Sequence, residues 1–88
     1  MSTIDTQDPR ATRLPSYRDI DRLEIARDAA GLLLAVAGID AAHRRYVTRH
    51  NASTGGGGFS GQQVAHVCSL RRRHRYALAA AERMEATP

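Results

Sequence analysis

An apolar pattern at helical spacing places the strongest constraint on the fold of this 88-residue sequence. Apolar residues recur every three or four positions across residues 20–37, and acidic residues occupy another face of the same segment. This period is typical of an amphipathic α-helix. Ser16 followed by Asp19 has the spacing of a helix start, and Pro15 blocks extension towards the N-terminus. We therefore expect a helix over residues 17–37.

The same segment carries a second apolar face. No charged residue occurs between Asp28 and Asp40. Ile25, Leu32 and Val36 therefore form an apolar face on a different side of the helix from the first apolar pattern. A helix that is apolar nearly all round must be covered on more than one side. Burial within the chain and contact with a second copy would both cover it. We predict a homodimer with Ile25, Leu32 and Val36 in its interface.

Helix-ending and helix-starting signals divide the rest of the chain. Gly38 suits the left-handed residue that ends a helix, and Asp40 suits the cap of a second helix over about residues 41–50. Residues 51–59 contain four consecutive glycines and predict a flexible loop. Ser60 and Gln63 have the spacing of a capping box, which predicts a third helix over residues 61–85.

These elements predict an all-α fold: a small three-helix domain over residues 16–86, built from a helical hairpin and a long basic C-terminal helix. Residues 1–15 are polar, lack an apolar period and are expected to form a disordered tail. The chain has one Phe, three Tyr and no Trp, so the core depends on aliphatic residues and alanine. Such a core is thin, and pairing with another chain is a common remedy.

Charge is distributed unevenly along the chain. All 13 basic residues are arginine, which suggests a GC-rich coding sequence of bacterial or phage origin. Residues 1–38 hold five arginines and six acids, whereas residues 39–88 hold eight arginines and three acids. Guanidinium groups suit phosphates and carboxylates. The candidate binding residues for an anionic partner are Arg71, Arg72, Arg73, Arg75, Arg44, Arg45 and Arg49.

Two geometries are open for the arginine-rich segment. One straight helix would leave the cluster as a solvated or partner-facing surface. Alternatively, residues 62–78 resemble a helix-turn-helix motif, with Val64 and Ala65 in the first helix, a turn at residues 68–69, and Leu70 and Leu78 in the second. The resemblance implies that the second helix enters the major groove of DNA. Ser69 stands where such turns usually carry glycine, and Arg75 where a buried aliphatic residue is usual.

Several classes of function are disfavoured. Cys68 is the only cysteine, the start of the chain does not match a signal peptide, and the longest apolar run is too short to span a bilayer, so we expect a cytoplasmic protein without a membrane partner. The histidines lack metal-site spacing, and the carboxylates lie mainly on one exposed helix face. We expect neither metal nor cofactor, and no enzymatic activity.

The leading hypothesis is a DNA-binding regulatory protein whose residues 71–75 contact the duplex, assisted by Arg44, Arg45 and Arg49. Partners in this reading are DNA or an acidic protein surface. The alternative is an accessory or inhibitor protein from a phage or mobile element, such as an anti-CRISPR-like blocker, that binds one protein through the same basic face. A small stabilising subunit of a larger complex is a third reading.

Overall fold

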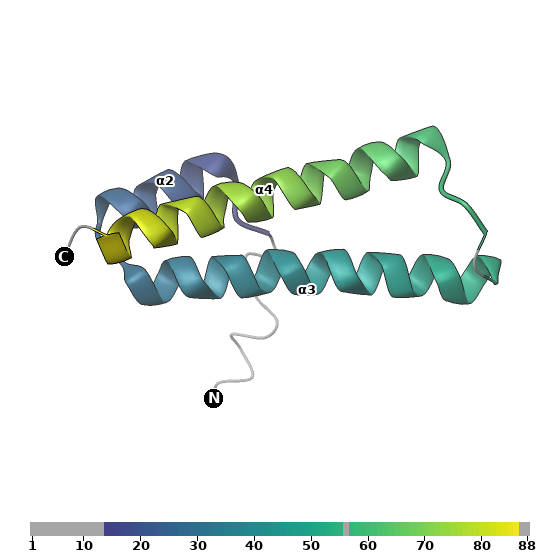
Figure 1. The fold of residues 1–88 in the computed structure, drawn as a ribbon, viewed down its shortest axis with the longest axis horizontal. Helices are drawn as coiled ribbons and strands as arrows, with labels where there is room; N and C mark the ends of the chain where they lie inside the picture. The colour runs from purple at the N-terminus through teal and green to yellow at the C-terminus, as the bar shows by residue number, and fades with distance from the viewer. Residues whose placement is uncertain (1–13, 56, 87–88) are drawn as a thin grey trace, which may run out of the picture.

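The computed structural model describes residues 14–55 and 57–86, and this part of the chain contains three helices and no strand. The helices are α2 (Tyr17–Ile25), α3 (Ala29–Thr54) and α4 (Gly61–Ala86). α3 and α4 run antiparallel side by side as a long hairpin, and α2 lies beside the C-terminal half of α4 (Figure 1). The all-α class is confirmed. The predicted tail, residues 1–15, lies outside the described residues except for its last two.

The expected helix over residues 17–37 is wrong, because the chain turns at residues 26–28. The amide of Asp28 donates to the carbonyl of Leu23 and the amide of Arg27 donates to Glu24, which is the bonding of a Schellman motif. Arg27 takes the left-handed conformation with φ 61°. Asp28 then caps α3, since its Oδ1 accepts from the amide of Gly31 at 2.8 Å.

The predicted helix end at Gly38 and the second helix over residues 41–50 are also wrong. α3 passes through Gly38 without interruption and ends at Thr54, with Gly55 as its C-cap at φ 68°. The loop predicted over residues 51–59 is therefore wrong for residues 51–54, which belong to this helix. A Cβ added at Gly38 would meet nothing within 4 Å, so no packing contact requires glycine there. The hairpin therefore joins α3 to α4, and α2 is a separate short helix.

The helix start predicted at Ser16 and the capping box predicted at Ser60 are confirmed, and both form capping boxes in the structure. At the start of α2 the amide of Ser16 donates to Asp19 Oδ2 at 2.9 Å, and the amide of Asp19 donates to Ser16 Oγ at 3.1 Å. At the start of α4 the amide of Ser60 donates to Gln63 Oε1 at 2.7 Å, with the reciprocal bond at 3.2 Å. α4 then continues unbroken to Ala86. The turn that a helix-turn-helix requires at residues 68–69 is absent, and that resemblance is wrong.

The core lies where α2 covers the hairpin. Its fully buried members come from all three helices, and partly buried apolar residues surround them; the set is Ile20, Leu32, Ile39, Ala77, Ala80, Leu23, Val36, Ala81 and Met84. Alanines on α4 keep side chains short at this contact, which allows the helices to approach closely. Leu32 is fully buried within the chain, so its predicted place in a dimer interface is wrong. Val36 packs against the same core, whereas Ile25 is 80% exposed.

Candidate nucleic-acid interface

The seven candidate arginines surround the middle of the hairpin and do not share one face. Five of them line three hollows. The first, called here the Arg71 hollow, lies between α3 and α4 and is lined by Asp40, His43, Arg71, His74, Arg75 and Leu78. The second, the Arg49 hollow, is lined by Leu14, Ala42, Arg45, Tyr46, Arg49, His66 and Leu70. Arg72 lines a third, more open hollow together with Tyr17, Arg75, Tyr76 and Ala79.

The five exposed arginines of these hollows remain unneutralised within the described residues. Arg45, Arg49, Arg71, Arg72 and Arg75 have no carboxylate partner there. Arg44 differs, because its Nη2 lies 2.7 Å from Asp40 Oδ2 across one helical turn. Exposed pairs of this kind contribute little to stability but reduce the charge available to a ligand. Among the seven candidates, the free cations are therefore Arg45 and Arg49 on α3 and Arg71, Arg72 and Arg75 on α4.

Arg73 has a structural contact instead of a free guanidinium. Its Nη1 lies 3.5 Å from the carbonyl oxygen of Pro15, and its guanidinium lies 6.0 Å from the centre of the Tyr17 ring. Its Nε is buried and has no hydrogen-bond partner in the described part of the chain. The side chain thus packs against the start of α2. Its predicted role as a binding residue is not supported, because a run of arginines in the sequence does not show which member faces another helix.

A cluster of aromatic and histidine side chains supports the Arg49 hollow from the loop side. His50 is buried, its Nε2 lies 2.9 Å from the carbonyl oxygen of Gly57, and its ring stacks on Phe59 with centroids 4.0 Å apart. Tyr46 contacts His66 at a centroid distance of 4.5 Å. These contacts fix the loop between α3 and α4. The sequence alone does not identify His66 and Tyr46 as lining residues, because they become neighbours only when α4 folds back along α3.

The two hollows differ in their acidic residues. The Arg49 hollow has two arginines and one histidine in its lining and no carboxylate. The Arg71 hollow contains Asp40, and the adjoining hollow along the same groove contains Glu82 and Glu85. A long polyanion that lies in the Arg71 hollow and extends along this groove would meet these carboxylates. The Arg49 hollow is therefore electrostatically the better surface for a phosphate backbone.

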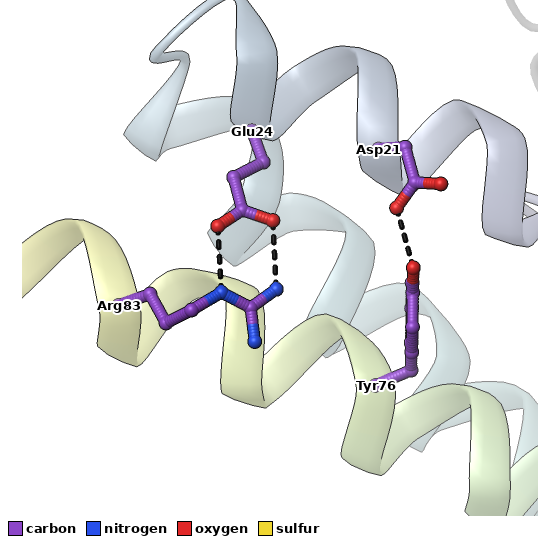
Figure 2. Close-up of polar contacts among 4 residues, drawn as sticks. All are labelled: Asp21, Glu24, Tyr76 and Arg83. Atoms are coloured by element: carbon purple, nitrogen blue, oxygen red, sulfur yellow. Dashed lines mark hydrogen bonds and ion pairs between the residues drawn. The ribbon is translucent and has the colours of Figure 1, made fainter.

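Acidic residues of α2 bind α4 at two points (Figure 2). Nε and Nη2 of Arg83 donate to the two oxygens of Glu24, each at 2.7 Å, and Tyr76 Oη donates to Asp21 at 2.6 Å. The hydrogen bond from Arg83 lowers the pKa of Glu24 and raises the pKa of Arg83. The hydrogen bond to Asp21 raises the pKa of Tyr76. These carboxylates attach α2 to the hairpin.

Other chemistry is sparse in residues 14–55 and 57–86. No group of three or more His, Cys, Asp or Glu side chains there is close enough to hold a metal ion. Cys68 is exposed and forms no disulfide. None of the described helices combines the length and hydropathy needed to cross a membrane.

Comparisons with known proteins add no relative. No protein-family model matches the chain, and searches of curated proteins and of solved structures gave no significant match.

Proposed function

We propose that this protein is a small non-enzymatic DNA-binding protein with a regulatory role, and that Arg45 and Arg49 on α3 contact the phosphate backbone. The observation that carries the proposal is the Arg49 hollow, where two unneutralised guanidinium groups and His66 lie together without a carboxylate in the lining. Arginine forms paired hydrogen bonds with phosphate oxygens. Binding replaces the repulsion between these cations with attraction to the polyanion and releases counterions.

The mode of binding differs from the sequence hypothesis. Because α4 is continuous, no separate recognition helix exists at residues 62–78. Arg45 and Arg49 are one helical turn apart and lie about 6 Å apart along the axis of α3, so both can face one stretch of backbone. Contacts of this kind position a protein on DNA and carry no base readout. We therefore expect affinity for duplex DNA with little sequence preference.

A salt titration tests the proposal. The full chain is titrated with random-sequence duplex DNA at several salt concentrations, and the slope of log K against log salt is measured. Each phosphate neutralised contributes about −0.9 to this slope, so the double variant Arg45→Gln with Arg49→Gln is expected to flatten it by about 2. Arg22→Gln, an exposed site on α2, is the single-charge control and is expected to change the slope little.

The predicted contact of residues 71–75 with DNA is tested in the same titration. The double variant Arg71→Gln with Arg75→Gln removes the same charge from the Arg71 hollow. If it flattens the slope as much as the Arg45 and Arg49 variant does, both hollows bind DNA. Absence of binding to the unmodified chain at low salt contradicts the whole proposal.

A second candidate function rests on a separate observation. Large apolar side chains are exposed near the start of α3, where Leu33 is 61% exposed, Leu34 is 75% exposed and Ile25 of α2 is 80% exposed. Exposed apolar groups of this size favour a protein contact. The alternative function is therefore a protein-binding accessory, inhibitor or stabilising subunit. Binding to one specific protein, together with no binding to DNA at low salt, would support this alternative.

Two further properties expected from the sequence stay proposals under either function: a cytoplasmic location and assembly as a homodimer. The interface first expected for that dimer is unsuitable, because Leu32 is fully buried and Val36 packs on the core.

A further inference from the structure

One exposed stripe of α4 changes sign along its length. Residues spaced alternately four and three apart fall on the same side of a helix, as in the seam of a coiled coil. On α4 this spacing gives Arg71, Arg75, Leu78, Glu82 and Glu85. The stripe therefore begins with two cations, has leucine at its centre and ends with two carboxylates, over about 21 Å of helix.

The stripe is available for contact. Its four charged members are exposed, and Leu78 is 38% exposed. None of the four has an ion-pair partner within residues 14–55 and 57–86. Opposite charges separated by seven or more residues on one helix are too far apart to neutralise each other directly. The charges therefore remain for a partner to satisfy.

An apolar hollow continues from the stripe towards α3. It has a volume of about 540 Å³ and is lined by Ala29, Leu33, Leu78, Ala81, Glu82, Met84 and Glu85. Leu78 also lines the Arg71 hollow, so the two hollows form one groove. α2 covers another part of the hairpin: Ile20 packs in the core there, and Asp21 and Glu24 bind Tyr76 and Arg83 of α4.

A partner for this groove needs an apolar centre with negative charge facing Arg71 and Arg75 and positive charge facing Glu82 and Glu85. A second α4 in antiparallel orientation has this arrangement. Aligned on Leu78, it places Glu85 of the second copy opposite Arg71 and Glu82 of the second copy opposite Arg75. A parallel pair would instead place like charges together. A two-fold dimer requires a self-complementary patch, and the sign change about Leu78 provides one.

We propose that the protein forms a two-fold homodimer through antiparallel contact of the α4 stripes, with Leu78 and Leu33 of both copies at the centre. This interface replaces the one first expected from Ile25, Leu32 and Val36. Arg45 and Arg49 line a different hollow and remain open to an anionic ligand. The dimer does not depend on DNA binding, and it is tested without DNA.

The test uses two charge-reversed forms of the full chain. One carries Arg71→Glu and Arg75→Glu, which makes the stripe entirely acidic, and the other carries Glu82→Arg and Glu85→Arg, which makes it entirely basic. Sedimentation equilibrium measures the dimer Kd of each form and of their mixture. All four sites are exposed on a helix, and circular dichroism checks that each form folds.

Each reversed form is expected to raise the dimer Kd by about tenfold or more, because four attractive pairs per dimer become repulsive. An equimolar mixture is expected to restore dimers as heterodimers, since every pair is then attractive. The form that carries all four substitutions regains homodimers, which is unique to the antiparallel arrangement. A chain that is monomeric at every accessible concentration overturns the proposal. A dimer that survives both reversals, or a mixture that forms no heterodimer, also overturns it.

Discussion

Replacing Gly38 with alanine distinguishes the two backbone conformations considered for this position. In the structure Gly38 lies inside α3, and a Cβ there would meet nothing within 4 Å. Alanine in a helix interior is more stable than glycine by about 0.5–1 kcal/mol. In a domain of this size that gain corresponds to a rise in Tm of about 2–8 °C. A left-handed residue at a helix end would give the opposite sign, because alanine is strained there by about 1–2 kcal/mol.

Thermal unfolding followed by circular dichroism at 222 nm measures the change, and Gly31→Ala is the matched control. A Cβ at Gly31 would lie 2.6 Å from Asp28 Oδ2 and 2.8 Å from Leu23 Cδ2. The substitution displaces the cap of α3 and is expected to lower stability by at least about 1 kcal/mol. The two glycines are thus expected to respond in opposite directions. A fall in Tm for Gly38→Ala would refute the continuous α3.

Three further predictions concern the contacts that shape the hairpin. Arg27→Gly is expected to raise the free energy of unfolding in urea by about 0.5 kcal/mol, because φ 61° is strained for arginine and not for glycine. A lower stability would show that contacts of the arginine side chain outweigh that strain. His50→Ala is expected to lower stability by about 1–3 kcal/mol, because it removes the hydrogen bond to Gly57 and the stack on Phe59. His50→Phe retains the stack and is expected to recover part of this loss. Equal losses in the two variants would contradict a contribution from stacking. The Glu24 contact is expected to stabilise the fold above the unfolded-state pKa of the carboxyl, and this stabilisation is lost as pH falls through the lowered pKa of the folded state. The raised pKa of Tyr76 has the opposite sign: its contribution to stability is expected to be lost as pH rises through the alkaline range. Tm measured against pH for the unmodified chain and for Glu24→Gln checks the acid limb, which disappears in the variant if the contact is responsible.

Local signals in the sequence were sufficient for the helical class and for two helix starts. Ser16 with Asp19 and Ser60 with Gln63 form capping boxes because each pair satisfies amides within the same turn, independently of the rest of the molecule. α4 begins at Gly61 as predicted for the same reason, and it ends at Ala86, one residue beyond the expected range. The exposed state of Arg71, Arg72 and Arg75 follows from similar logic, since consecutive residues on a helix cannot all face one side.

The misplaced turn has a physical explanation. Glycine favours the left-handed conformation that ends a helix and arginine does not, so local propensity predicts the turn at Gly38 and not at Arg27. The chain bends at Arg27 because the bend brings Ile20 against Leu32 and Ile39 in one core, and that burial exceeds the strain at a single residue. The energy that decides the bend comes from residues distant in sequence.

The sequence by itself determined that this protein is helical, where α2 and α4 begin and which half of the chain is basic, because these properties depend on neighbours within one or two turns. The tertiary structure decided which side of each helix is covered. Leu32 is buried and Leu33 is 61% exposed, although they are adjacent, because consecutive residues point about 100° apart and only the packing of α2 and α4 selects one direction. The same packing engages Arg73, leaves Arg45 and Arg49 free, and joins Glu24 to Arg83 across 59 positions of the chain.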